Sequence, residues 1–129
     1  YIPHEDTPLG AGMTLADEYR KHQLELGLKM IACARLLLED VNIASTTALQ
    51  ALDPKGRELG LLAGGNVIMP NVTDTSYRKS YQLYAGKPGI NESSDQSIAA
   101  LTRSIDAVGE TILWDVRGDS KHYFRRHGR

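Results

Sequence analysis

Cysteine is nearly absent from this sequence of 129 residues, in which Cys33 is the only one. A single thiol excludes an internal disulfide, and it excludes a metal site built from cysteines alone. Cys33 lies in the run KMIACARLLL, whose apolar and helical character indicates a packing role. We therefore expect this chain to bind no metal by itself.

An excess of charge and a long apolar run are also missing. The 15 Lys and Arg residues balance the 16 Asp and Glu residues, so charge points neither to nucleic acid nor to an acidic membrane surface. No apolar run approaches the roughly 20 residues that span a bilayer, and no signal peptide is visible. These absences predict a cytoplasmic protein with one domain over residues 1–129, whose basic segment 117–129 is a mobile tail.

The apolar spacing predicts short strands that alternate with helices. The expected elements are a strand end at 1–3, a helix over 14–38 with a bend at Gly27, a strand over 41–45, a helix from Asp53-Pro54 to Gly64, a strand over 66–69, a short helix within 73–84 and a helix from Ser94 to Gly109. Such alternation indicates an α/β protein of parallel βα units. Both a doubly wound sheet and part of a (β/α)8 barrel fit. Because the chain opens on the end of a strand, we expect a slice of a (β/α)8 barrel.

Polar or soft side chains follow the strands at their carboxyl ends, where parallel βα folds bind ligands. The three ends read Ile2-Pro3-His4, Ser45-Thr46-Thr47 and Met69-Pro70-Asn71. Taken singly, a threonine pair is ordinary turn chemistry and a methionine is an ordinary core residue. Their coincidence at three strand ends suggests a ligand site. No phosphate-binding glycine loop and no nucleophile elbow is present, so we predict no catalytic residue in this chain.

Six runs of letters together resemble one family: IPHEDTPL, STTAL, GREL, GGNVIMPN, SYQLYAGK and VRGDSKH. The family is that of the radical S-adenosylmethionine (SAM) maturases of iron-only ([FeFe]) hydrogenases, called HydE. The resemblance is to their C-terminal part, also known as the biotin and thiamin synthesis associated domain. It covers nearly the whole chain apart from a longer, charged insert around residues 10–23, and NVIMPN followed by YQLY carries most of its specificity.

The resemblance implies a complete (β/α)8, or TIM, barrel in a longer parent protein. That parent would hold SAM and a 4Fe-4S cluster bound by a Cys-x3-Cys-x2-Cys loop. The loop is absent here, so the chain is not expected to be catalytic alone. The positions that the resemblance assigns to SAM are Met69, Tyr81 and Leu83, and those that it assigns to the substrate cavity are Thr46, Thr47, Tyr84, Ile2 and His4.

Two departures from related patterns narrow the interpretation. Gly89, Ser97 and Ala100 stand where some family members have three cysteines, so no second cluster is expected. The strand NIASTT lacks the arginine that ligates the 2Fe-2S centre of biotin synthase, which argues against that enzyme.

Two alternatives remain open. One is a different radical SAM enzyme, similar to biotin synthase or methylornithine synthase, and the other is a non-catalytic module that binds a ligand or a partner. The expected partners are the N-terminal barrel half of the parent and other hydrogenase maturation proteins. We also expect self-association, because a slice of a barrel exposes strand edges. Nucleic acid and membrane are not expected partners.

Overall fold

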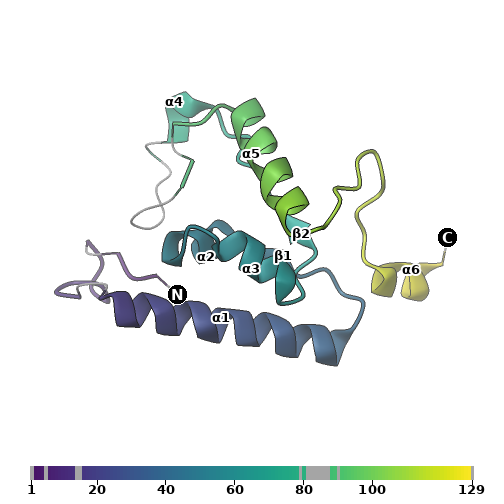
Figure 1. Ribbon diagram of the computed structural model, residues 1–129, viewed down its shortest axis with the longest axis horizontal. Coiled ribbons are helices and arrows are strands. Elements are labelled where there is room, and N and C mark those ends of the chain that lie inside the picture. The colour runs from purple at the N-terminus through teal and green to yellow at the C-terminus, as the bar shows by residue number, and fades with distance from the viewer. Residues whose placement is uncertain are drawn as a thin grey trace.

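The computed structural model describes residues 2–4, 6–13, 16–78, 80, 88–89 and 91–128. Helices dominate it, and the elements in chain order are α1 (Asp17–Leu38), β1 (Ala44–Ser45), α2 (Thr47–Leu52), α3 (Gly56–Leu62), β2 (Val67–Ile68), α4 (Thr75–Arg78), α5 (Ser94–Ala107) and α6 (Lys121–His127). Figure 1 shows α1 along one side, α2 and α3 next to it, and α5 on the side of these helices away from α1.

The sheet consists of β1 and β2, which pair in parallel with Ala44 opposite Val67 and Ser45 opposite Ile68. This small parallel sheet among helices is compatible with the expected α/β class. Both strands are shorter than the sequence predicts. At the amino end, the N–H of Ile43 donates to the Asn66 side chain instead of to a backbone carbonyl, and at the carboxyl end Pro70 has no N–H to donate. The predicted strand end at 1–3 is wrong for Ile2 and Pro3, which lie in no strand.

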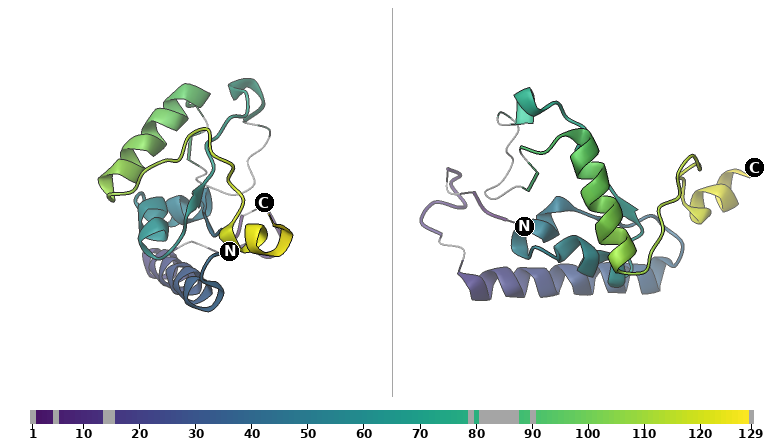
Figure 2. Two further views of the ribbon diagram at one scale, coloured as in Figure 1. Left: turned by 90° about the vertical axis from the view of Figure 1, so that its right-hand side faces the viewer. Right: turned by 45° about the horizontal axis from the view of Figure 1, so that its top comes forward.

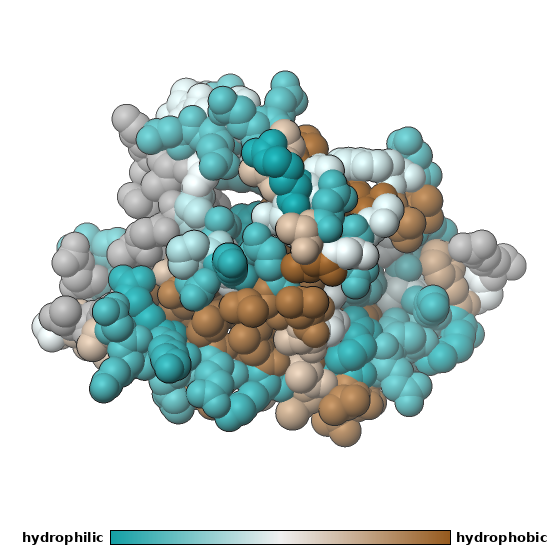
Figure 3. Space-filling model, in the orientation of Figure 1, coloured by the Kyte–Doolittle hydropathy of each residue, from teal (hydrophilic) through white to brown (hydrophobic). Residues whose placement is uncertain are grey.

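Helix α1 confirms the predicted long helix but shows no break at Gly27. Its packed side lies against α2 and α3, as the two views in Figure 2 also show. Figure 3 shows apolar side chains gathered in a band where α1 meets these helices. A Cβ at Gly27 would lie 3.2 Å from the Leu49 side chain, so the glycine provides room for α2. Packing rather than helix propensity therefore explains this glycine.

Helix α3 lies very close to β1. Ser45 is only 1% exposed, and its hydroxyl donates to the carbonyl of Arg57 at 2.9 Å. A Cβ on Gly60 would come within 2.2 Å of the Ser45 Oγ and 2.8 Å of Leu49 Cδ1. The helix can lie this near the strand because Gly60 has no side chain.

Arg35 joins the end of α1 to the beginnings of both strands. Its Nε donates to Gly64 O at 2.9 Å, and its Nη1 donates to the carbonyls of Glu39 at 2.5 Å and Val41 at 2.9 Å. Its Nη2 donates to Asn66 Oδ1 at 3.0 Å, and the same oxygen accepts from the N–H of Ile43 at 2.8 Å. One guanidinium thus holds three segments at the amino edge of the sheet.

Two helix boundaries differ from the prediction in the segment 46–64. The sequence analysis placed no helix over 47–52, where the structure has α2 with Thr46 as its N-cap residue. Asp53 was expected to cap a helix beginning at Pro54, but α3 begins at Gly56 and the Asp53 carboxylate accepts from the N–H of Lys55 at 2.7 Å. Asp53 therefore shapes the turn between two helices. The predicted stop at Gly64-Gly65 is confirmed.

Helix α5 begins at Ser94, as the sequence predicts. A capping box formed by Ser93 and Gln96 holds its first turn. The Ser93 hydroxyl accepts from the N–H of Gln96 at 3.1 Å, and the Gln96 side chain accepts from the N–H of Ser93 at 2.8 Å. Leu101 and Ile105 form the packed side of this helix, and each is 8% exposed. Gly109, at φ 78°, follows the helix end as expected.

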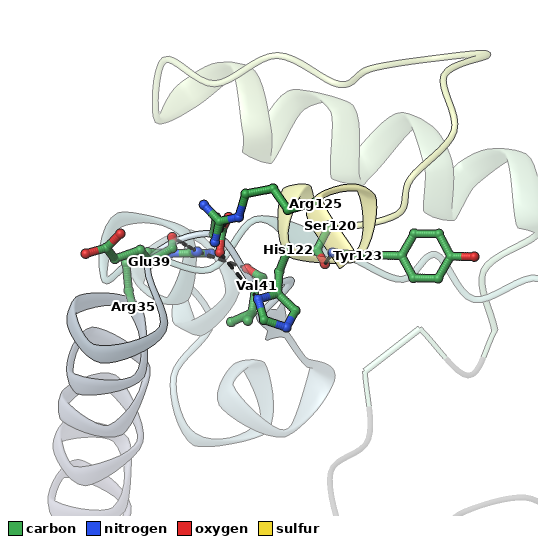
Figure 4. Close-up of polar contacts among 8 residues, drawn as sticks. Arg35, Glu39, Val41, Ser120, His122, Tyr123 and Arg125 are labelled. Atoms are coloured by element: carbon green, nitrogen blue, oxygen red, sulfur yellow. Dashed lines mark hydrogen bonds and ion pairs between the residues drawn. The ribbon is translucent and has the colours of Figure 1, made fainter. Parts of the chain in front are cut away.

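The segment 117–129 contains a helix that the sequence analysis did not predict. Ser120 caps α6, since its hydroxyl accepts from the N–H of Tyr123 at 3.1 Å. Arg125 Nη2 lies 2.6 Å from the Asp40 carboxylate, and Asn42 Nδ2 donates to Gly118 O at 2.7 Å. Figure 4 shows Arg125 and His122 directed toward the loop after α1 and Tyr123 directed away. The segment 117–129 thus contains a helix that contacts the rest of the fold, whereas the sequence analysis expected no regular structure there. That this segment is mobile stays a prediction.

We expect Gly60→Ala to destabilise the fold. Alanine favours a helix by about 1 kcal/mol. The clash of the new Cβ with Ser45 and Leu49 outweighs this gain, because overpacking a tight contact costs about 1–3 kcal/mol. Urea unfolding followed by circular dichroism measures the change. Gly118→Ala is the matched control, since its Cβ meets nothing within 4 Å. A Gly60→Ala variant as stable as the control would contradict the close approach described above.

Candidate functional site at the strand ends

The carboxyl ends of β1 and β2 lie side by side at one edge of the sheet. Since Ser45 pairs with Ile68, the next residues along the two strands are Thr46 and Met69. The parallel register thus brings together two of the three strand ends that the sequence marks. This is the edge at which parallel βα folds bind ligands.

Thr46 and Met69 both have side chains available at this edge. Thr46 precedes α2 in an extended conformation, and its hydroxyl makes no capping bond to the helix. Met69 is 59% exposed although it directly follows a strand. Thr47 is the first residue of α2 and is half-buried. The two positions that follow the paired strands therefore carry a hydroxyl and an exposed thioether.

The chain leaves β2 through a loop that is fixed by Arg78. This arginine is 4% exposed, and its Nε donates to Thr73 O at 2.6 Å and its Nη2 to Asn71 O at 2.9 Å. Its Nη1 donates to Gly89 O at 2.7 Å and also to Glu92 O. The guanidinium therefore ties the segment that leaves β2 to the segment that leads into α5.

A second bond fixes the same loop to α5. The Ser97 hydroxyl, on a residue that is 5% exposed, accepts from the N–H of Asn71 at 3.2 Å. Asn71 therefore takes part in two bonds that hold it between Arg78 and α5. The sequence Met69-Pro70-Asn71 ends the strand because the proline cannot donate and the asparagine is bound elsewhere.

Helix α4 begins next to the anchored loop at Asp74. The Asp74 carboxylate accepts from the Ser76 hydroxyl at 2.6 Å and from the Ser76 N–H at 2.8 Å. These hydrogen bonds lower the pKa of the Asp74 carboxyl, first through the hydroxyl and then through the backbone. The ionised form, and with it the cap of this short helix, is favoured at neutral pH.

The other predicted site residues divide into two groups. Tyr81, Leu83 and Tyr84 lie outside the described residues. Ile2 and His4 are described and half-buried. His4 bonds locally, since its Nδ1 accepts from the N–H of Asp6 at 3.2 Å and its carbonyl accepts from Thr7. Their assignment to a substrate cavity stays a prediction.

The sequence analysis did not identify Arg78 as important. It named Ser97 only because some family members have a cysteine at that position. Arg78 lies in a polar segment, where an arginine is usually exposed, and no local pattern shows that it is buried. Ser97 and Gly89 prove to be structural: one accepts from Asn71 and the other provides a carbonyl to Arg78. The four carbonyls that accept from Arg78 lie on both sides of it, in loops without a regular pattern, so only the folded chain displays this arrangement.

A groove of about 900 Å³ lies at a different place, between β2, α5 and the segment 110–121. Its walls include Ile98, Leu101, Ile105 and Trp114, while Arg35, Asn42 and Asn66 lie at its polar end. Neither Thr46 nor Met69 lines it. The groove and the strand-end site are therefore separate features.

The described residues do not fit an iron–sulfur cluster. Cys33 is exposed on α1, and the described part of the chain contains no group of three His, Cys, Asp or Glu side chains placed to hold a metal. SAM fits better, because the exposed thioether of Met69 can pack against adenosine or a sulfonium group. In the ranges that the structure describes, no helix has both the length and the apolarity to cross a membrane.

Comparison with known proteins supports the family resemblance. A scan against models of known protein families finds no match. The chain is 45% identical over 109 residues to the [FeFe] hydrogenase maturase subunit HydE of Thermotoga maritima. The chain is related to HydE. The match covers 84% of this chain but only 29% of that protein, of which it corresponds to the C-terminal part.

We expect Arg78→Lys to loosen the strand-end loop. A lysine keeps the charge but cannot reach the four carbonyls that Arg78 serves, so stability should fall by about 2–3 kcal/mol. Hydrogen exchange should accelerate at Asn71, whose N–H is held within this loop. Arg103→Lys, at an exposed position of α5, is the control. Unchanged exchange at Asn71 would show that the loop does not depend on Arg78.

Proposed function

We propose that this chain forms the C-terminal, ligand-binding part of a HydE-like radical SAM enzyme that matures the active-site cluster of [FeFe] hydrogenase. The 45% identity to HydE carries this proposal, because it extends over 84% of the chain. The relation favours a maturase over the alternatives similar to biotin synthase or methylornithine synthase, and over a non-catalytic module.

The fold supports a role as part of a larger barrel. The described sheet has two strands, so each strand has an outer edge without a described partner strand. Further parallel strands of a (β/α)8 barrel would pair with these edges. In this arrangement the chain packs against the N-terminal barrel half of the parent. Other hydrogenase maturation proteins are further proposed partners.

The strand-end residues divide into two proposed roles. Met69, together with Tyr81 and Leu83, contacts SAM, and a soft thioether suits both adenine and the sulfonium. Thr46 and Thr47, with Tyr84, Ile2 and His4, line the substrate cavity, where hydroxyl groups orient a polar substrate. In the parent, SAM and a reduced 4Fe-4S cluster would together supply a 5'-deoxyadenosyl radical. The residues of this chain bind and orient, and the cluster ligands belong to the remainder of the parent.

The coding sequence upstream of Tyr1 tests this proposal directly. It should continue in frame and encode a Cys-x3-Cys-x2-Cys loop near the beginning of the barrel. An open reading frame that begins close to Tyr1 would overturn the proposal and favour a separate binding module.

The isolated chain should take up no iron–sulfur cluster, because Cys33 is its only cysteine. Anaerobic reconstitution with iron and sulfide, followed by visible absorption and iron analysis, measures this. The full-length parent is the positive control. Stoichiometric iron on the isolated chain, lost in a Cys33→Ser variant, would contradict the assignment of the cluster ligands to the rest of the parent.

In the full-length parent, Met69→Ala should weaken SAM binding by about 1–2 kcal/mol, the loss expected for a soft, partly buried contact. The double variant Thr46→Val, Thr47→Val should leave SAM binding unchanged and reduce substrate turnover, because valine keeps the shape and removes the hydroxyl. Isothermal titration with SAM and a turnover assay separate the two effects. If both variants lose SAM affinity equally, the division between cofactor and substrate residues is wrong.

A further inference from the structure

Residues 110–127, which we call the strap, follow α5 and end in α6. Most of residues 110–121 line the groove beside β2 and α5, so the strap forms one of its walls. In Figure 1 the strap leaves α5 as an extended loop before it reaches α6. Its large apolar side chains stay in contact with water, since Leu113 is 76%, Trp114 60% and Val116 59% exposed. The strap therefore borders the groove without being packed into the apolar core.

The strap is joined to the fold at two places that lie far apart along it. It continues from α5 through Gly109, which has φ 78° and at which an added Cβ would meet nothing within 4 Å. A glycine in such an open position allows the backbone to turn without a steric clash. Toward the other end, Asn42 Nδ2 donates to Gly118 O at 2.7 Å. The strap can therefore turn about Gly109 when its contacts near α6 break.

The strongest contact near α6 is an ion pair with the carboxylate of Asp40. Arg125 Nη2 lies 2.6 Å from Asp40 Oδ2, and His122 Nδ1 lies 4.0 Å from Oδ1 (Figure 4). The Asp40 side chain is 13% exposed, and neither of its buried oxygens has a hydrogen-bond partner of good geometry among the described residues. Charges on α6 thus compensate this carboxylate, and water would replace them if α6 left. Because ion pairing and hydration nearly offset each other for a buried charge, closed and open positions of α6 differ little in free energy.

Apolar packing adds little to the attachment of α6. None of the residues of this helix is buried. The Tyr123 ring lies 4.5 Å from the His127 ring and 5.4 Å from the Arg117 guanidinium, and both of these partners belong to the strap. Segments that bury so little surface open locally at a low free energy, without unfolding of the rest of the chain.

We propose that the strap opens and closes over the groove by turning about Gly109, and that the ion pair of Arg125 with Asp40 holds it closed. When the strap opens, the apolar residues of α5 that line the groove become accessible from its side. Helix α6 has only seven residues, so it melts on release, because isolated helices of this length are not stable in water. The opening does not depend on the proposed binding of SAM, because Met69 does not line the groove.

Hydrogen exchange measured by NMR on the 129-residue chain tests the attachment. The N–H groups of Phe124 and Gly128 donate within α6, so their exchange rates report on release of this helix. Asp40→Asn and Arg125→Gln should each raise these rates by about fivefold or more, while N–H groups in the middle of α5 keep their rates. The double variant should exchange no faster than either single variant, because both changes remove the same contact.

The movement itself is measured by the distance between two spin labels, on Arg103→Cys in α5 and Arg126→Cys in α6, in a Cys33→Ser background. Both labelled positions are exposed. The parent chain should give one narrow distribution of distances. Asp40→Asn should add a broad component at longer distances, because the released strap samples many positions.

Arg126→Gln is the matched control for the exchange experiment, since it removes one positive charge at an exposed position of the same helix. It should exchange like the parent chain. Unchanged exchange and distances in Asp40→Asn and Arg125→Gln would overturn the ion pair as the contact that holds the strap. Equal acceleration in α5 and α6 would show that the whole fold loosens, and acceleration by Arg126→Gln would show an effect of net charge. Either result would also overturn the proposal.

Discussion

The guanidinium of Arg35 holds the amino edge of the sheet, and the rest of the structure depends on it. Two strands of two residues each provide few ladder bonds of their own. Arg35 compensates because it binds the end of α1, the entry to β1 and the turn before β2 at once. Asn66 extends this network by accepting from both Arg35 and Ile43. The hydrogen bonds that the charged guanidinium donates therefore stabilise this edge, where the ladder between two such short strands is not sufficient.

The opposite edge of the sheet carries the proposed ligand site. The close contact of Ser45 with Gly60 fixes α3 against β1, and the register then sets Thr46 beside Met69. Arg78 does for the loop after β2 what Arg35 does for the amino edge, since it binds carbonyls from both sides of the loop. Two buried or half-buried arginines thus confine the backbone, while the side chains between them remain available. A ligand site formed this way is on a fixed edge rather than on a free loop.

The parts of the fold that the sequence predicted are those governed by local chemistry. The long helix α1, the start of α5, the glycine stops and both strands follow from apolar spacing and end signals. Predictions failed where contacts between distant residues decide the outcome. Helix α2 was missed because it is a short run that packs between α1 and α3, and α6 was missed because the ion pair of Arg125 with Asp40 joins residues far apart in the sequence. The strand end at Ile2 was inferred from the opening residues, and the structure has no strand there.

By itself the sequence determined the α/β alternation, the soft and polar residues at the strand ends and the relation to HydE. These depend on residue type and spacing along the chain, which are legible without coordinates. Only the tertiary structure decided that Thr46 and Met69 are neighbours, that Arg78 is buried among four carbonyls and that Arg125 pairs with Asp40. Each of these depends on which segments pack together. Burial and register are properties of the assembled chain, because a residue's neighbours in space are set by every other contact that the chain makes.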